Sequence, residues 1–268
     1  MLQPLSTDLY LASLPHMASD FGVPPSSVQH TLSLFVVGFG TAQLISGPLS
    51  DRFGRRPVIV GGLTIYLLAS IGCAMSPDLN WLVASRFAQA VGCCTGVVVA
   101  RAVVRDVYSP SDGARILAKA SSLLSLAPIF GPILGSYLQV SFGWRAAFVA
   151  HALVGLMVWF GAVRHMTESN AQPNPRAMAL GELGKAYGEV FRSMGFWAYA
   201  LPGALSYASI FVFISGASFV LIKVLNVATE HYGYMFSLGV LGYLSGTLIC
   251  RRLLNSHGIQ GVLRLGTT

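Results

Sequence analysis

The sequence is poor in charged residues, and its few cysteines form no pattern that would bind a metal or build a disulfide framework. Only 10% of its 268 residues are charged, whereas about a quarter are charged in typical soluble domains, and the mean hydropathy is +0.64. Cys73, Cys93, Cys94 and Cys250 all lie in apolar stretches, where a thiol behaves as a small apolar side chain. These features exclude a soluble protein with a single core and give no support to a metal site.

The positive charge of the sequence does not indicate a nucleic-acid-binding protein. The formal net charge is +7, but the basic residues occupy short gaps between apolar runs. A surface that follows a phosphate backbone would need them clustered among polar residues. No polar segment holds a nucleophile with a neighbouring base, a metal cluster or a phosphate-binding loop. We therefore expect no nucleic-acid partner, no enzymatic activity and no bound cofactor.

Long apolar runs are what the sequence has in abundance. A helix rises about 1.5 Å per residue, so about twenty apolar residues cross the hydrocarbon core of a bilayer. Seven runs approach or reach this length: Val28–Leu49, Val58–Met75, Leu79–Val103, Ile116–Gln139, Ala146–Val163, Phe196–Leu221 and Tyr232–Cys250. The shorter apolar stretch Met1–Pro15 precedes them, and a further helix would begin near Gly261. The sequence predicts an all-α, polytopic membrane protein.

The loops between these runs differ in their content of arginine and lysine. Short cytoplasmic loops of membrane proteins carry the excess of positive charge. Alternate loops here hold Arg52, Arg55 and Arg56; Arg105, Arg115 and Lys119; Arg164, Arg176, Lys185 and Arg192; and Arg251, Arg252 and Arg264. The loops on the other side hold only Arg145 and Lys223. The first set of loops is therefore predicted to face the cytoplasm.

The first of these cytoplasmic loops carries the most specific pattern in the chain. Residues 47–58 read GPLSDRFGRRPV and resemble the signature loop G-x-L-[AS]-D-R-x-G-R-[RK] of the major facilitator superfamily of secondary transporters. The resemblance implies two bundles of six helices and a conformational latch made of Gly47, Asp51, Arg52, Gly54, Arg55 and Arg56. Glycines allow tight turns and close helix contacts, and the charged groups can form ion pairs or cap helix ends. The alternative is that the arginines only fix the topology.

Compared with that fold, the chain reaches about eight of twelve helices. We expect residues 1–163 to form a six-helix N-terminal bundle with a truncated first helix. Residues 164–194 would form a cytoplasmic linker, because Asn170–Arg176 contains prolines and amides that break helices. Residues 195–268 would hold the seventh and eighth helices and the start of a ninth. We therefore expect a chain truncated at both ends, as a fragment, a misplaced start codon or a frameshifted gene would produce.

An acidic residue lies in the first apolar stretch. Asp8 would be at membrane depth, where an ionised carboxylate costs roughly 3 kcal/mol, so we expect it to exchange protons. Its segment, Leu5–Pro15, resembles S-T-D-[ML]-Y-L-P-A-L-P of the Bcr/CflA branch of drug:proton antiporters, with Ala12 in place of the first proline. The resemblance implies that Asp8 couples protons or binds a cationic substrate. The alternative is a carboxylate near a helix end that simply faces water.

The third apolar run also contains charge. An arginine within a membrane costs roughly 2.5 to 3.5 kcal/mol, so we expect Arg86 to face a cavity or an acidic or carbonyl partner. The segment Arg86–Gly92 resembles the R-x-x-Q-[GA]-x-G element of proton-coupled facilitators, which implies that Arg86 and Gln89 serve proton coupling in the cavity. The alternative is an arginine that extends to the nearby interface.

Arg105–Tyr108 resembles R-D-[LV]-[YF] of the Bcr/CflA branch, so Asp106 would join the latch arginines. An exposed salt bridge of little energetic weight is the alternative.

The run Ile116–Gln139 holds a cluster of prolines and glycines. A proline removes a backbone hydrogen bond and bends a helix, while a glycine lets a neighbouring helix approach. The cluster resembles the antiporter motif G-P-x-x-G-[GS], which is enriched in exporters, and comprises Pro128, Gly131, Pro132 and Gly135. Small-residue packing with no bearing on direction is the alternative. Aromatic residues would line an apolar drug cavity between the bundles, and we select Tyr10, Phe39 and Tyr207.

Together these patterns predict a proton-coupled exporter of small hydrophobic or cationic drugs, such as antibiotics, that lies as a multi-pass monomer in the bacterial inner membrane. It would work by alternating access around a cavity near the midplane, driven by the proton gradient. Two alternatives stay open: a transporter of a native small metabolite, and a truncated fragment that does not transport. A seven-helix receptor is disfavoured, since it would carry neither the charged loop nor a repeat across the central linker.

Overall fold

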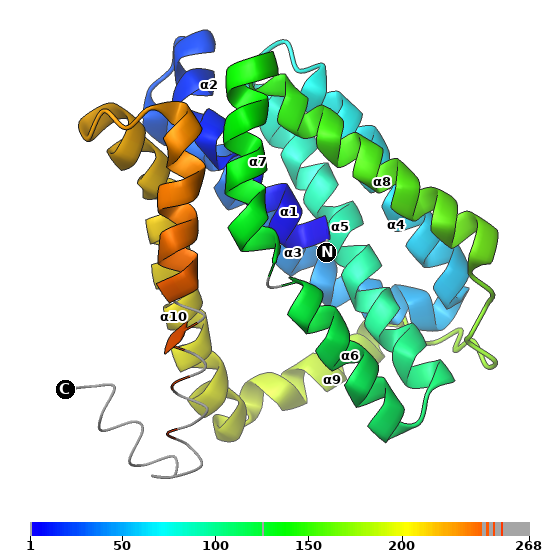
Figure 1. Ribbon diagram of the computed structural model, residues 1–268. Coiled ribbons are helices and arrows are strands. Elements are labelled where there is room, and N and C mark those ends of the chain that lie inside the picture. The colour runs from blue at the N-terminus through cyan, green and yellow to red at the C-terminus, as the bar shows by residue number, and fades with distance from the viewer. Residues whose placement is uncertain (1, 125, 243–244, 247–248, 250–252, 254–268) are drawn as a thin grey trace.

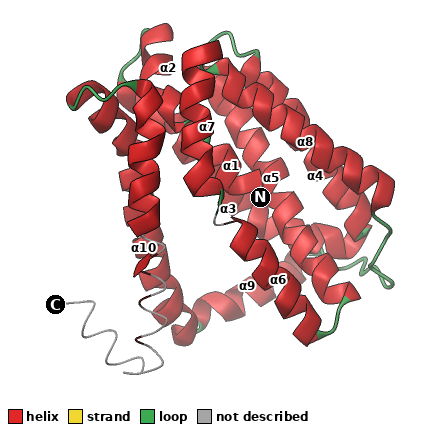
Figure 2. Cartoon of the chain, viewed as in Figure 1, coloured by secondary structure: helices red, strands yellow, loops and turns green. Residues whose placement is uncertain are grey.

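The computed structural model describes residues 2–124, 126–242, 245, 246, 249 and 253. Every regular element in this part of the chain is helical, as Figures 1 and 2 show. Within the described residues, six stretches are long and apolar enough to cross a membrane: Pro25–Phe53, Arg55–Ala74, Leu79–Val107, Pro110–Phe142, Arg145–His165 and Met194–Val224. They contain, to within one residue, the first six runs predicted from hydropathy, so the prediction of an all-α chain with several membrane helices is confirmed.

The elements follow one another as α1 (Leu2–Asp8), η1 (Leu11–Ser13), α2 (Leu14–Asp20), α3 (Pro25–Phe53), α4 (Arg55–Ala74), α5 (Leu79–Val107), α6 (Pro110–Leu124), α7 (Ala127–Phe142), α8 (Arg145–His165), α9 (Leu180–Arg192), α10 (Met194–Phe219) and η2 (Val220–Val224). Residues 229–242 are also helical and cover the first part of the predicted run Tyr232–Cys250. The rest of that run lies partly outside the described residues. The helix expected to begin near Gly261 lies wholly outside them.

Small residues bring the helices of the N-terminal part close together. Helix α4 packs against α5 and α8, and α5 packs against α3 (Figure 1). A Cβ at Gly92 would lie 2.5 Å from the backbone nitrogen of Tyr66, and one at Gly62 would lie 2.6 Å from the side chain of Thr95. A larger residue would push α4 and α5 apart. This packing holds the middle of α5 against α4, about two turns after Arg86.

The first apolar stretch is not one continuous helix. The sequence predicts helix over Met1–Pro15, but α1 ends at Asp8, and the backbone at Leu9 and Tyr10 forms a turn before η1. A Cβ at Gly135 of α7 would collide with the carbonyl oxygen of Leu9. The backbone at the break therefore packs closely against α7 at Gly135, where the absence of a side chain makes room for it. This tertiary contact overrides the helical preference of the apolar sequence.

The predicted run Ile116–Gln139 is also divided. Helix α6 ends at Leu124 and α7 begins at Ala127. Pro128 lies in the first turn of α7, where its missing N–H needs no partner. Pro132 lies in the interior of α7, where it removes one backbone hydrogen bond. The expectation that both prolines bend a single spanning helix is therefore wrong for Pro128, which starts a helix instead.

Helix α10 and residues 229–242 contact the rest of the chain at the end that carries α2 and the start of α8. The backbone N–H of Gly233 donates to the Ser136 hydroxyl at 3.1 Å, and His16 Nε2 lies 3.0 Å from the Thr229 hydroxyl. A Cβ at Gly233 would lie 2.6 Å from the carbonyl oxygen of Pro132. The larger hydrophobic core lies at this end and includes Tyr10, Leu14, Met17, Trp144, Phe148, Tyr232 and Phe236. Helix α9, which belongs to the linker segment 164–194, crosses at the opposite end and leads into α10 (Figure 1).

Candidate functional site

Arg55 is the centre of the predicted latch. It begins α4 directly after Gly54, and only 5% of its side chain is exposed. Its Nε donates to Asp106 Oδ2 at 2.8 Å, and its Nη1 donates to Asp51 Oδ1 at 2.5 Å and to the Ser50 hydroxyl at 2.6 Å. One guanidinium thus joins the end of α3, the start of α4 and the end of α5. The contact expected between Asp106 and the latch arginines is present.

The linker after α8 supplies an acid to this cluster that the sequence did not reveal. Both carboxylate oxygens of Glu168 accept backbone hydrogen bonds from the first turn of α4, from Arg55 N at 2.8 Å and from Arg56 N at 3.1 Å. Partial desolvation alone would raise the pKa of Glu168, but hydrogen bonds from the backbone of Asn170, Arg55, Arg56 and Ser169 outweigh it and lower the pKa. Glu168 therefore caps α4, where a helix favours negative charge.

Asn170 secures the other side of the same turn. Its side-chain amide donates to the carbonyl oxygen of Asp51 at 3.1 Å, and the backbone N–H of Asn174 donates to the same oxygen at 2.9 Å. These bonds satisfy carbonyl groups that the end of α3 leaves free. The predicted break in helical structure over Asn170–Arg176 is present, and the segment is docked on the latch. In the sequence, the one indication of this docking is that the polar residues of this segment and the basic loop at residues 47–58 are both predicted to lie on the cytoplasmic side.

The remaining latch residues differ in how far the structure explains them. Gly54 has a φ of +96°, and a Cβ there would lie 2.6 Å from a carboxylate oxygen of Glu168, so both the turn and the cap need glycine. Arg56 donates from Nη2 to the Val163 carbonyl oxygen at 3.1 Å. Arg52 is exposed and lies over the ring of its neighbour Phe53. Gly47 faces open space, so a close helix contact does not account for it.

Arg86 is fully buried inside the N-terminal helices. Its guanidinium carbon lies 4.3 Å from the ring centres of both Tyr10 and Phe35, so it is held by cation–π contacts. Its Nη1 donates to Gln89 Oε1 at 2.5 Å, and Gln89 Nε2 donates to the Ser70 hydroxyl at 2.7 Å. Within the described residues, its Nε and Nη2 have no hydrogen-bond partner. The carbonyl partner expected from the sequence is present as the side-chain amide oxygen of Gln89, and aromatic rings take the place of an acidic partner.

Asp8 lies where the first segment breaks and is 5% exposed. The Thr7 hydroxyl donates to its Oδ1 at 2.9 Å. A Cβ at Gly131 would lie 3.1 Å from the Cβ of Asp8, and Gly135, one turn further along α7, packs on the backbone of Leu9. The structure thus places Asp8, the predicted proton-coupling acid, against Gly131 of the antiporter-type motif, and the adjacent Leu9 against Gly135.

Three polar groups around α1 escaped the sequence reasoning. The Ser6 and Tyr66 hydroxyls lie 2.7 Å apart, and both residues are buried. His151 Nε2 donates to the Leu5 carbonyl oxygen at 3.1 Å, since a carbonyl can only accept. His151 is fully buried on α8. The available signal was weak: single polar residues within otherwise apolar runs, which far more often serve packing.

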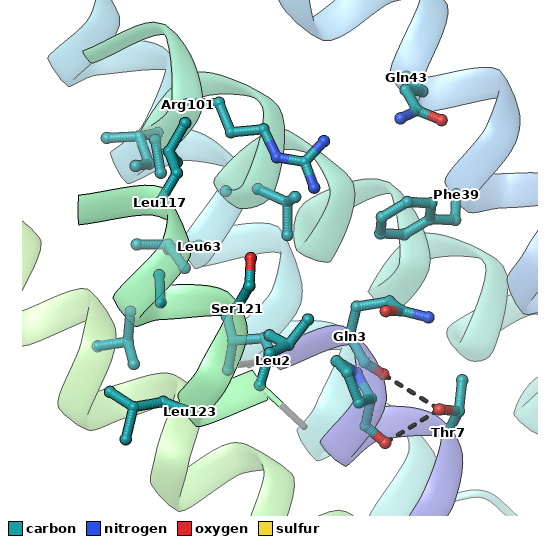
Figure 3. A pocket seen from close by; sticks show the side chains of 18 of the residues that line it. Leu2, Gln3, Thr7, Phe39, Gln43, Leu63, Arg101, Leu117, Ser121 and Leu123 are labelled. Atoms are coloured by element: carbon teal, nitrogen blue, oxygen red, sulfur yellow. Dashed lines mark hydrogen bonds between the residues drawn. The ribbon is translucent and has the colours of Figure 1, made fainter. Parts of the chain in front are cut away.

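A cavity of about 750 Å³ lies toward the latch end of the helices. Residues of α1, α3, α4, α5, α6, α8 and α10 line it, and most of them are apolar (Figure 3). Phe39 and Tyr207, both selected from the sequence, are on its wall. Asp8, Tyr10, Arg86 and Gln89 are not among its lining residues. Thr7, which holds the carboxylate of Asp8, is the lining residue next to that acid.

The sequence profile described as Major Facilitator Superfamily matches residues 1–268. The chain belongs to the major facilitator superfamily. Its relatives include a bicyclomycin resistance protein homolog of Haemophilus influenzae, 28% identical over 99% of this chain and 67% of the relative. A chloramphenicol resistance protein of Pseudomonas aeruginosa is 30% identical over 99% of this chain and 62% of the relative. Multidrug resistance protein MdtL of Escherichia coli is 26% identical over 89% and 60%.

Solved structures of the superfamily share the fold. A bacterial homolog of the human lysosomal transporter Spinster, described as inward-facing and unoccupied, superposes with a TM-score of 0.69 at 18% identity, over 95% of this chain and 63% of that one. A D-xylose-proton symporter gives a TM-score of 0.57 at 17% identity, over 94% and 66%. The chain spans roughly three fifths to two thirds of the length of the curated relatives named above. It is a multi-pass membrane protein of a transporter family rather than an enzyme.

Proposed function

We propose that the protein is a proton-coupled antiporter that exports small hydrophobic drugs, cationic ones among them, across the bacterial inner membrane. The observation that carries this proposal is the contact between Asp8 and Gly131. A buried carboxyl lies at a break in the first helix and packs on the helix whose motif resembles that of antiporters. The names of the relatives, which include resistance to bicyclomycin and chloramphenicol, support drugs as the substrate class.

Residues 1–163 would form one bundle, residues 164–194 the cytoplasmic linker, and residues 195–268 the start of the second bundle. The described contacts between the two bundles, such as His16 with Thr229 and Ser136 with Gly233, lie at one end. The cavity lies toward the other end, where the basic loops predict the cytoplasm. This arrangement corresponds to an inward-facing state. Alternating access would require those contacts to separate while the cavity closes.

The residues suggest how proton binding would reach the rest of the bundle. Protonation of Asp8 removes a buried negative charge, to which the Thr7 hydroxyl is the one hydrogen-bond donor among the described residues. Tyr10 lies two residues further along the same break, and its ring covers Arg86. A change in the charge of Asp8 would therefore alter the break and, through Tyr10, the position of Arg86. In this mechanism Arg86 and Gln89 are positioning residues, while Phe39 and Tyr207 would contact the substrate.

The experiment is drug efflux from vesicles that contain the chain and carry an imposed proton gradient, with chloramphenicol as the probe. Asp8→Asn keeps the shape of the side chain and removes its proton exchange, so we expect it to bind the drug and lose gradient-driven efflux. Asp112→Asn, in which the exposed acid of α6 is changed in the same way, should behave as the wild type. Unchanged efflux in Asp8→Asn would refute the coupling role. Absence of efflux in the folded wild-type chain would refute transport and favour the non-transporting alternative. Light scattering in detergent tests the proposed monomer.

A further inference from the structure

Among the described residues that line the cavity, one side chain is charged. It belongs to Arg101, near the end of α5, and it extends into the space between the helices (Figure 3). The other polar side chains of the wall are uncharged: Gln3, Thr7, Gln43, Ser121 and Tyr207. The electrostatic character of the cavity therefore depends on Arg101.

No carboxylate neutralises Arg101 in the part of the chain that the structure describes. The acids near it in the sequence are paired elsewhere: Asp106 with Arg55 at 2.8 Å, and Asp112 with Arg115 at 3.5 Å. A guanidinium keeps its charge at any physiological pH and carries five N–H donors. Arg101 is exposed, so water reaches its guanidinium, but a guanidinium with no carboxylate beside it still gives the cavity a positive electrostatic potential.

Two uncharged polar side chains face the same space. Gln43 projects from α3 and Ser121 from α6, and the guanidinium of Arg101 points from α5 into the region between them (Figure 3). Neither side chain forms a hydrogen bond with another described residue. An amide and a hydroxyl can both donate hydrogen bonds to an acceptor held by the guanidinium. Most of the other lining residues, Phe39 and Leu117 among them, are apolar.

We propose that Arg101, Gln43 and Ser121 form a subsite for the acidic head group of an amphiphilic ligand, with a carboxylate as the best fit. A carboxylate accepts two parallel hydrogen bonds from a guanidinium, and the apolar wall takes up the rest of the molecule. A cationic ligand would instead bring like charges together. This inference rests on the proposed drug export and narrows its substrates, since the cavity favours acidic and neutral amphiphiles over cationic ones.

The test uses three probes that share a naphthalene ring and differ in charge: 2-naphthoate, 2-naphthamide and 2-naphthylmethylamine. Their affinities for the purified chain are measured in a neutral detergent at low salt. We expect the wild type to bind the carboxylate more tightly than the amine. Arg101→Gln should weaken carboxylate binding about tenfold, the loss expected for one charge-assisted pair, and change amide binding by less than about twofold. Arg101→Glu should reverse the order of carboxylate and amine.

Matched variants separate a local effect from a general one. Arg105→Gln removes the same charge from the same helix outside the cavity wall, and should leave all three affinities as in the wild type. Arg101→Lys keeps the charge and should keep the preference for the carboxylate. The inference is overturned if Arg101→Gln retains the wild-type order, if Arg101→Lys shows no preference, or if Arg105→Gln loses as much as Arg101→Gln.

An acidic head group can come from a soluble amphiphile or from an anionic phospholipid. The naphthoate titration is therefore repeated in vesicles of zwitterionic lipid with and without phosphatidylglycerol. Competition by that lipid assigns the subsite to a phospholipid head group, and its absence assigns the subsite to a soluble acid. Efflux of neutral chloramphenicol, measured in parallel, tests the proposed function by itself. If efflux occurs and the charge preference does not depend on Arg101, the subsite fails alone. If the preference depends on Arg101 and efflux is absent, only the export proposal fails.

Discussion

Replacing Glu168 by alanine should free the first two backbone amides of α4. The first four N–H groups of a helix have no acceptor within the helix, so Arg55 N and Arg56 N depend on the carboxylate, at 2.8 and 3.1 Å. Such a cap is worth about 1 kcal/mol, and roughly half of that should remain for a carboxylate that is mostly exposed to water. An opening free energy lower by about 0.5 to 1 kcal/mol corresponds to amide exchange faster by about two- to fivefold.

Hydrogen–deuterium exchange of the peptide that spans residues 51–58 measures this effect. Pro57 has no N–H, so the amides of Arg55 and Arg56 contribute a large share of the signal. Glu168→Gln keeps one acceptor oxygen and should give an intermediate rate. Glu182→Ala, which removes an exposed acid from the first turn of α9, should leave the peptide unchanged. Equal exchange in Glu168→Ala and the wild type, or equal acceleration in the control, would refute the capping argument.

The same cap predicts a pH dependence with a definite sign. The pKa of Glu168 in the folded protein lies below the ordinary value of 4.5. The stabilisation from its carboxylate is therefore fully present above pH 4.5 and is lost as the pH falls through the lower folded-state value. Once the intrinsic effect of pH on exchange is subtracted, the protection of the two amides should persist down to pH 4.5 and decline below it. Loss of protection at a higher pH would contradict this assignment.

Two further pairs of variants follow, each measured as thermal unfolding in one detergent. Gly135→Ala places a methyl group against the backbone at the break in the first segment, and should lower the free energy of unfolding by about 1 to 3 kcal/mol. Its control, Gly47→Ala, adds a methyl group that faces open space within a helix, and should leave stability unchanged or raise it. Equal effects of the two variants would refute the packing argument. In Arg55→Lys, the lysine has no planar group that can bind Asp106 and the end of α3 at the same time, so the free energy of unfolding should fall by about 1 to 3 kcal/mol. Its control, Arg52→Lys, should change stability by less than about 0.5 kcal/mol. If Arg55→Lys is as stable as the wild type, positive charge alone is sufficient at this position.

Hydropathy and charge were sufficient to predict most of the fold. Twenty apolar residues must form a helix in a bilayer because no other local structure satisfies the backbone there. The runs that became α3, α4, α5, α8 and α10 were therefore readable one at a time. The same reasoning failed where a run contains a break: the turn after Asp8 and the division before Ala127 are set by contacts with other helices, and hydropathy averages over them.

The candidate site divides in the same way. The Arg55 and Asp106 contact was foreseeable because both residues lie in short polar segments on the same predicted side of the membrane. The aromatic partners of Arg86 and the cap provided by Glu168 were not foreseeable. They depend on the rotation of each helix about its axis and on where the linker docks, and neither is expressed in a local pattern.

The sequence by itself thus determined the class of protein, its membrane helices and its superfamily, because these follow from hydropathy, charge and one specific loop. Only the tertiary structure decided that Asp8 packs on Gly131, that Arg86 is held by aromatic rings, and that Arg101 faces the cavity with no carboxylate partner among the described residues. The physical reason is that the free energy of placing a side chain in the membrane depends on the chemistry of that side chain. Its role depends instead on the neighbours that packing between distant helices brings to it.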